Sequence, residues 1–229
     1  MKCRIRLAAG HLKTVLTHKY WVFRYAFTAG IPVRGLLHDL SKFSPAEWGE
    51  SIRYYTGKRS PIRDARAENG YSLTWIHHRG RNRHHFEYWL DNRADGGLTV
   101  VPMPFFCALE LICDRLGAGR AYRKKNFTLE EQVFRFHQDI ESSPLVHPQT
   151  KRFVGSVFIA LNEAPDKQAF KKILRNARTY YDRAWEETFR DSANPDPQTL
   201  LIHYLLPEQV SDFLSPKQRG MFPEPPTRD

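Results

Sequence analysis

Residues 33–48 of the chain read VRGLLHDLSKFSPAEW, and they place His38 and Asp39 side by side directly after two leucines. Leu36, Leu37 and Leu40 have the spacing of apolar residues on the buried face of a short helix, so an imidazole and a carboxylate are expected where that helix ends. Lys42 follows three residues after Asp39. A histidine–aspartate pair alone says little about function, so its meaning depends on the partners that other segments supply.

The rest of the chain has the apolar spacing of helices and few strand signals, which predicts an all-α fold. Gly30 is expected to end the first helix, and Gly117 to end a later one. Ser44 and Glu47 have the spacing of a capping box at the start of the third helix. Helices are predicted over residues 9–29, 32–39, 71–92, 104–117, 129–142, 147–163 and 167–191 and from Ser44 onward, with a loop at 57–70, a turn at 95–104 and an extended tail from Asn194.

The composition describes a globular, basic chain. Its 229 residues are 41% hydrophobic and 13% aromatic, enough for one large core and unlike a disordered chain. The net charge of +10 indicates an anionic partner: a phosphorylated small molecule, nucleic acid or a membrane surface. The basic residues are scattered along the sequence, so a nucleic-acid groove is the less favoured interpretation.

The cysteines and the N-terminus bear on the compartment. Three cysteines without CxxC spacing indicate neither a disulfide framework nor a thiolate zinc site. The N-terminal segment is too polar for a signal peptide, and no uncharged apolar run reaches the length of a membrane span. The sequence therefore predicts a cytoplasmic protein that does not associate with a membrane.

Histidines and carboxylates recur on the predicted inner faces of several helices. His18 lies three residues after Val15 and four before Val22, which places it on the apolar face of the first helix. The segment TWIHHRGRNRHHFEYW carries two histidine pairs seven residues apart, so one member of each pair is expected to face inward. Asp114 lies three residues after Leu111, on a face where a carboxylate needs a partner. The candidates are His18, His38, Asp39, one of His77 and His78, one of His84 and His85, and Asp114.

This set of side chains suits a metal centre. Imidazoles and carboxylates are accepted by first-row divalent ions such as Fe, Mn, Co and Zn. Ligands from several packed helices can converge on an ion in the core, which neutralises carboxylates that are costly to bury. The six candidates suffice for one or two ions, with the carboxylate of Asp39 bridging to the second.

The order H…HD…H…H…D on successive helices resembles the HD-domain superfamily, and HDLSK is similar to the HDIGK and HDLGK forms of its dinuclear branches. The runs GLLHDLSKFSPAEW, HHRGRNRHHFEYW and ALELICDRLGA are more similar still to an HD-like bacterial and phage family without an assigned activity. The resemblance covers roughly residues 10–160. It implies an HD-like helical bundle over 1–160, followed by additional helices and a proline-rich tail over 161–229.

The resemblance also implies roles for individual residues. His18, His38, Asp39 and Asp114 would be metal ligands, joined by His78 and His85 if the second member of each histidine pair faces inward. Lys42 would lie near the metal-bound substrate, and Lys42 and Asp39 are the candidate catalytic residues. Ser41 stands where the phosphodiesterase branch named for its HD and GYP motifs has glycine, and the GYP segment is missing. Both departures argue against hydrolysis of cyclic dinucleotides.

Other polar residues near these motifs have alternative interpretations. Asn82 can orient a ligand imidazole or be an exposed polar residue. Glu110 shares the face of Asp114 and can act as a base, orient a ligand or pair with an arginine. His11, His137, His147 and His203 are interpreted as ordinary histidines.

Three functions fit this pattern. In a phosphohydrolase, metal ions would activate water for attack on phosphorus, with Lys42 and arginines such as Arg79, Arg81 and Arg83 stabilising negative charge. In an oxygenase with two iron ions, a C–H, C–C or C–P bond would be cleaved. A non-catalytic module binding metal, nucleotide or nucleic acid is the third. We expect the hydrolase, acting on a small anionic and phosphorylated substrate, because that activity is the commoner in the superfamily; the oligomeric state stays open.

Overall fold

The computed structural model describes residues 2–190, and it describes the side chains of residues 5–188 and 190. The first two-thirds of this part consist of α1 (Lys2–Thr28), α2 (Pro32–Leu37), the 3-10 turn η1 (Leu40–Phe43), α3 (Pro45–Arg53), α4 (Pro61–Asn69), α5 (Leu73–Arg81), the 3-10 turn η2 (Phe86–Tyr88), β1 (Leu90–Asn92), β2 (Leu98–Val100) and α6 (Phe105–Arg123). The remainder consists of the 3-10 turn η3 (Lys124–Asn126), α7 (Leu129–Phe136), the π-helical turn η4 (His137–Glu141), α8 (Pro148–Asn162), α9 (Lys167–Arg175) and α10 (Ala177–Arg190). The predicted all-α class is confirmed, and the expected tail from Asn194 lies outside the described residues.

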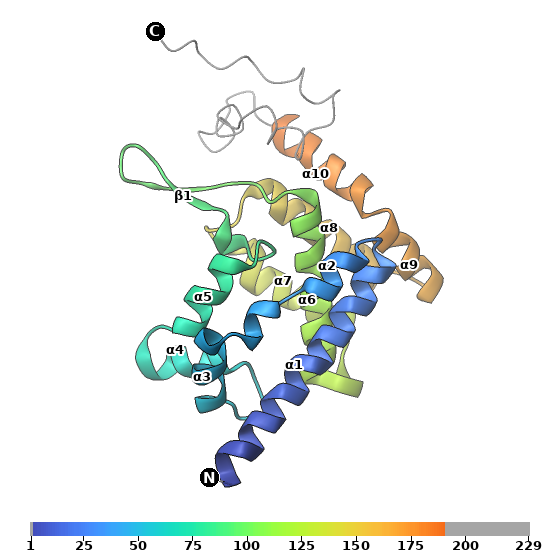
Figure 1. Ribbon diagram of the computed structural model, residues 1–229. Coiled ribbons are helices and arrows are strands. Elements are labelled where there is room, and N and C mark those ends of the chain that lie inside the picture. Colours follow the sequence, from blue (N-terminus) through green and yellow to red (C-terminus); the bar gives the residue numbers. More distant parts are fainter. Residues whose placement is uncertain (1, 191–229) are drawn as a thin grey trace.

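The helices form a bundle around α1 and α6 (Figure 1). Contacts between these two helices advance in the same direction, from His18 with Asp114 to Tyr25 with Arg120, so the helices run parallel. Gly117 makes the close approach possible, because a Cβ at that position would lie 2.5 Å from the Val22 side chain. Gly117 therefore lies inside α6, and the prediction that it ends the helix is wrong.

A second layer of helices closes the core on the other side of α6. Buried aromatic side chains from α8 and α10 fill it, among them Phe153, Phe158, Tyr181 and Trp185. The Tyr181 hydroxyl donates a hydrogen bond of 2.9 Å to the backbone oxygen of Met103, which ties α10 to the start of α6. The single helix predicted over 167–191 is two helices, since α9 ends at Arg175 and α10 begins at Ala177, after Asn176.

Two predictions about the middle of the chain are wrong. Residues 57–70 are not all loop, because α4 begins after Ser60 at a proline, buries Ala65 and ends at Asn69, before Gly70 with its φ of 80°. Residues 71–92 are not one helix, because α5 ends at Arg81 and the chain continues through η2 into β1. Strand β1 pairs antiparallel with β2, which lies within the predicted turn.

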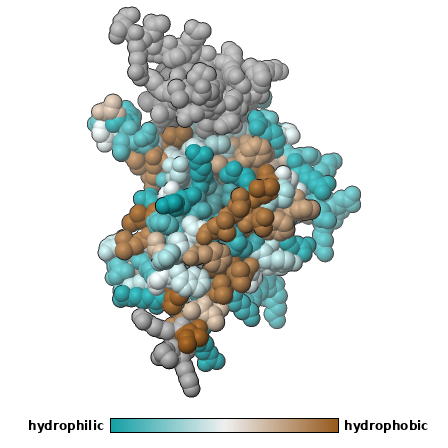
Figure 2. Space-filling view, viewed as in Figure 1, coloured by the Kyte–Doolittle hydropathy of each residue, from teal (hydrophilic) through white to brown (hydrophobic). Residues whose placement is uncertain are grey.

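Large apolar side chains remain exposed on α1, α2 and η1, and Figure 2 shows brown apolar residues on the face where α1 and α2 lie in Figure 1. Among the described residues, no helix has both the length and the apolar character needed to cross a bilayer.

Candidate metal centre

Six segments of the chain deliver the histidines and carboxylates to one place in the bundle. Helix α1 supplies His18, α3 supplies Glu47, α5 supplies His78, and α6 supplies Glu110 and Asp114. The link between α2 and η1 supplies His38 and Asp39, and the turn between α5 and η2 supplies His84 and His85. Most of these side chains are almost fully buried; Asp39 is 1% exposed and His38, His78 and His84 are each 2% exposed.

The backbone at Asp39 is what turns two adjacent side chains toward the same place. His38 has an extended conformation at the end of α2, and Asp39 has a φ of 53° in the left-handed region. Non-glycine residues seldom adopt this conformation, although aspartate tolerates it better than most. In a continuous helix the two side chains would diverge by about 100°. Here both reach the same cluster.

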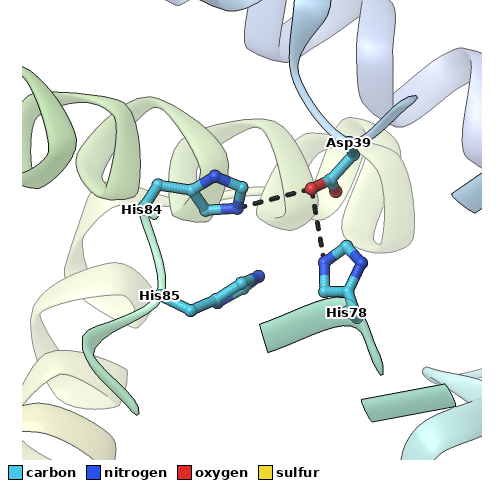
Figure 3. Close-up of side chains that lie close together, drawn as sticks. All are labelled: Asp39, His78, His84 and His85. Carbon is cyan, nitrogen blue, oxygen red and sulfur yellow. Dashed lines mark ion pairs between the residues drawn. The ribbon is translucent and has the colours of Figure 1, made fainter. Parts of the chain in front are cut away.

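The two carboxylate oxygens of Asp39 face different sets of ligands. Oδ1 lies 3.3 Å from Nε2 of His78 and 3.4 Å from Nε2 of His84 (Figure 3). Oδ2 lies 3.1 Å from Nε2 of His38 and 3.5 Å from Nε2 of His18. Two groups of four potential ligands result, and in each group the donor atoms lie within 4.8 Å of one another. The first cluster comprises Asp39, His78, His84 and His85, and the second comprises His18, His38, Asp39 and Asp114.

Carboxylates orient three of the imidazoles by contacting Nδ1, the ring nitrogen that does not face Asp39. Nδ1 of His78 lies 2.8 Å from Oε2 of Glu47. Oε1 of Glu110 lies 3.0 Å from Nδ1 of His38 and 3.3 Å from Nδ1 of His84. Because an ionised carboxylate only accepts hydrogen bonds, each Nδ1 carries a proton, and in the neutral imidazole each Nε2 therefore has a lone pair available for a metal ion. This carboxylate–histidine arrangement is the one that metal-ligating histidines usually have.

Glu110 is close enough to His38 and His84 to form a third possible ligand group with them. Its other oxygen, however, accepts a hydrogen bond of 2.9 Å from Nε of Arg34. A carboxylate shared between two Nδ1 protons and a guanidinium is occupied on both oxygens. We therefore interpret Glu110 as the residue that orients both imidazoles.

Several buried atoms of the first cluster have unmet bonding capacity. Oδ1 of Asp39 and Nε2 of His84 and of His85 make no hydrogen bond with another described residue, whereas Oδ2 of Asp39 forms an ion pair with Nζ of Lys42. Buried polar atoms without partners are rare in native proteins. A cation bound between Oδ1 of Asp39 and Nε2 of His84 and His85 would satisfy all three atoms, so the residues present fit a metal ion.

The pKa values of the histidines fall into two groups. Burial lowers the pKa of His38 and of His78, but the neighbouring Asp39 carboxylate and hydrogen bonds to carboxylates outweigh it, so the pKa of both is raised. Burial lowers the pKa of His84 and of His85, and the adjacent histidines lower it further. Without a metal ion, protons on the first two histidines balance the carboxylates; a metal ion would displace them, because only neutral imidazole coordinates.

The carboxylates stay ionised although they are buried. Burial raises the pKa of Asp39 and Asp114, but contacts with histidines hold both well below the usual range. The same balance lowers the pKa of Glu110 to about 2. Lys42 Nζ lies 2.5 Å from Oδ2 of Asp39. Burial opposes its charge, yet the Asp39 and Asp114 carboxylates raise the pKa of Lys42 to about 12, so it stays cationic.

The structure brings together all six ligands predicted from the sequence, namely His18, His38, Asp39, His78, His85 and Asp114. It also adds residues that the sequence did not select. His84 lies in the first cluster beside His85, because the chain has left the helix and both members of the pair point inward. His77 is partly exposed and contacts Glu47 instead.

Glu47 was predicted to complete a capping box with Ser44, and this prediction is wrong. Ser44 makes no side-chain capping hydrogen bond, and the Glu47 carboxylate is 1% exposed between Nδ1 of His77 and Nδ1 of His78. The Asn82 side chain donates hydrogen bonds of 2.8 Å to the Ser41 hydroxyl and to the His78 backbone oxygen, so it supports the His78 segment. Arg81 and Arg83 are exposed.

The fold and these clusters define an all-α protein with a buried histidine–carboxylate centre that can hold metal ions. The chain belongs to a family of unknown function (DUF5662), which spans residues 7–159 and so includes every member of the two clusters. No curated protein and no solved structure matches the chain.

Proposed function

We propose that this protein is a metal-dependent hydrolase of phosphate esters, with two divalent ions held by the two clusters and bridged by Asp39. The observation that carries the proposal is the division of the Asp39 oxygens, one facing His78 and His84 and the other facing His18 and His38. A bridging carboxylate between two sets of imidazoles is the donor set of a dinuclear centre. The resemblance of HDLSK to the HD-domain superfamily supports the same proposal.

The ligand chemistry favours Fe, Mn, Co or Zn over Mg or Ca, because imidazole nitrogens outnumber carboxylates in the first cluster and equal them in the second. When bound, two such ions would supply a nucleophilic water at neutral pH and neutralise charge on a phosphoryl group.

Substrate would approach from the side of Lys42 and Asp114. Their side chains are 26% and 15% exposed, whereas the side chains of His38 and Asp39 are 0% and 1% exposed. Solvent therefore reaches the second cluster beside a lysine ammonium. A cation fixed at that place can bind an anionic oxygen and stabilise the charge that develops on it. The net charge of +10 also suits an anionic substrate.

The second candidate is the oxygenase with two iron ions, which would use the same ligands. Deep burial of the first cluster favours it, since a small gas can reach such a place more readily than a bulky anion. The ion itself separates the two candidates. Protein that retains iron, develops a near-ultraviolet band in air and consumes dioxygen with an organic substrate would establish the oxygenase and refute the hydrolase.

The direct test is phosphate release from a panel of nucleotides and sugar phosphates by protein reloaded with Mn, Co or Zn. We expect turnover that disappears when the metal is removed and in Asp39→Asn. Lys42→Met should lower kcat/KM by roughly 10²-fold, the usual effect of removing one stabilising donor, whereas Lys58→Met, an exposed lysine, should not. Metal-loaded protein that hydrolyses nothing in the panel, or turnover that survives chelation, would contradict the proposal.

A further inference from the structure

A surface groove lies between the C-terminal half of α1 and α9, away from the metal centre. It has a volume of about 450 Å³, and four aromatic side chains line it: Trp21, Tyr25, Phe127 and Phe170. Figure 1 shows α9 beside the C-terminal end of α1. We call this feature the α1–α9 groove. Its size falls within the range of small-molecule sites, and its aromatic content is that of a site that receives planar groups.

The cations around the α1–α9 groove have no carboxylate partners in the described part of the chain. Arg24, Arg120, Lys167 and Lys171 line it, and Lys172 and Arg175 extend the row into an adjoining hollow. Within residues 2–190, none of the six forms an ion pair, whereas other surface arginines such as Arg53, Arg59 and Arg93 do.

One carboxylate, Asp166, lines the groove, but it is already engaged. Its Oδ1 accepts hydrogen bonds of 2.8 Å from the backbone nitrogens of Gln168 and Ala169 at the start of α9. It is therefore held at the helix end and does not pair with the lysines. The groove consequently presents an unneutralised positive charge to an anionic ligand.

Two guanidinium groups are fixed on the aromatic rings. The guanidinium carbon of Arg120 lies 4.2 Å from the ring centre of Phe127 and 5.5 Å from that of Trp21. Its Nε donates a hydrogen bond of 3.2 Å to the Tyr25 hydroxyl. The guanidinium of Arg24 lies 5.9 Å from the Trp21 ring centre. Such preorganised planar cations bind phosphates with little further loss of conformational freedom, and they stack on flat rings.

We propose that the α1–α9 groove binds nucleotide units, with the base against the aromatic and guanidinium planes and the phosphates on the row of lysines and arginines. Cationic rows beside aromatic rings are the combination that proteins use for single-stranded nucleic acids. Lys167, Lys171 and Arg175 are spaced four residues apart and so share one face of α9 over about 12 Å. This row of cations extends beyond the groove, which only Lys167 and Lys171 line. A single-stranded nucleic acid can contact all three cations, whereas a free nucleotide can occupy the groove alone.

This site is distinct from the metal centre and does not depend on the proposed function. Tyr25 lies seven residues beyond His18 on α1, and Arg120 six residues beyond Asp114 on α6, so the two places are separated by about 10 Å along the helices. Between the two sites, Val22 of α1 and Gly117 of α6 are in close contact, so the two helices leave no gap there.

The test is the binding of a fluorescent 12-nucleotide single-stranded DNA to the full chain, measured by anisotropy over a range of salt concentrations. Lys171→Glu with Arg175→Glu should weaken binding more than tenfold and reduce the slope of log K against log salt by about 1.4, the value for two lost phosphate contacts on a single strand. The matched control is Lys58→Glu with Arg63→Glu, which changes the net charge equally at two exposed cations elsewhere. It should leave most of the affinity and the slope intact.

Competition experiments with other polyanions and with free nucleotides define which class of ligand the groove binds. We expect the oligonucleotide to bind more tightly than polyphosphate or polyglutamate of matched charge, because these lack bases. Displacement by ATP at low concentration would assign the groove to a free nucleotide, and displacement by oligonucleotides alone would assign it to a strand; either result supports the proposal. Equal affinity for polyglutamate, or equal losses in both double variants, would overturn it.

Discussion

Asp39 has a left-handed backbone conformation that costs on the order of 1–2 kcal/mol for a residue with a side chain. Strain of this kind persists where the surrounding structure requires it, and it is frequent at functional sites. Here it permits one carboxylate to face two sets of imidazoles. Asparagine tolerates the same conformation, so Asp39→Asn removes the charge without disturbing the backbone.

Glu110 is expected to control metal affinity without touching the ion. Its Oε1 holds the Nδ1 protons of both His38 and His84. In Glu110→Gln the amide has one acceptor oxygen and no charge, so either both imidazoles or the Arg34 guanidinium lose their acceptor, and any hydrogen bond that the imidazoles keep is weaker. We predict a loss of roughly 10–100-fold in metal affinity, the usual effect of removing such a partner, measured by competition with a chelator. Glu131→Gln, which removes a surface carboxylate paired with Arg135, should have no effect; equal affinities in the two variants would contradict this role.

His11 gives the chain a dependence on pH that is independent of the metal ligands. Its ring lies against Trp48 and Tyr55, and burial, with the charge of Lys42, lowers the pKa of His11 from 6.5 to about 4. The unfolded chain therefore binds the proton more readily between these values. Stability is complete above pH 6.5 and declines as the pH falls toward 4, by at most about 3 kcal/mol.

Replacing His11 with phenylalanine removes this titration while keeping an aromatic ring in place. We predict that His11→Phe loses less free energy of unfolding between pH 7 and pH 5 than the unmodified chain, as measured by urea denaturation. Equal losses in the two proteins would show that His11 contributes nothing to the pH dependence.

The sequence predicted the candidate metal ligands better than it predicted the residues that orient them. The inward orientation of the His18 and Asp114 side chains follows from apolar neighbours at helical spacing, and the structure places both residues in the second cluster. His84 was not selected, because the choice between two adjacent histidines assumed a continuous helix. Glu47 was assigned to a cap, since its local spacing matches a capping box and gives no sign of its contact with α5.

At the scale of elements, the end of α5 shows why local patterns were insufficient. The run HHRGRNRHHFEYW contains no proline, and its one glycine, Gly80, lies within α5 and not at its end. The Asn82 side chain bonds the His78 backbone oxygen, and the Trp89 indole donates to the Arg83 backbone oxygen. These contacts depend on the fold around them. The start of α4 at Ser60-Pro61 and its end at Gly70 were readable signals, but the polar composition of the segment outweighed them in the prediction of a loop.

The parallel packing of α1 on α6 positions ligands in the second cluster. In Gly117→Ala the new Cβ would lie 2.5 Å from Cγ2 and 2.9 Å from the backbone nitrogen of Val22. We predict a destabilisation of about 1–3 kcal/mol and weaker binding of one metal ion, because His18 and Asp114 are carried by the two helices. Denaturant unfolding and metal titration would measure the two effects.

Gly49→Ala is the matched control for this prediction. Gly49 is exposed on α3, and nothing lies within 4 Å of its added Cβ. Alanine in a helix interior should leave stability unchanged or raise it by up to about 1 kcal/mol. If both substitutions have the same effect, the close contact at Gly117 does not hold the helices in place.

At the scale of the whole molecule, folding itself assembles the centre, since the two clusters draw on residues from His18 to Asp114. A metal ion that binds only the folded chain must therefore stabilise it. Free metal at 100 times its Kd contributes about 2.7 kcal/mol, which corresponds to a rise in Tm of roughly 5–10 °C for a chain of this length. We predict this rise in calorimetry of the unmodified protein, and none for Asp39→Asn; a similar rise in both would place the ion elsewhere.

The central claim is tested most directly by the number of ions per chain, measured by elemental analysis of protein purified without a histidine tag and loaded with Mn or Zn. We predict two ions in the unmodified chain, one in Asp114→Asn, none in Asp39→Asn, and two in His137→Ala, whose exposed imidazole contacts Glu141 outside the clusters. Full occupancy in Asp39→Asn, or loss of metal in His137→Ala, would contradict the account.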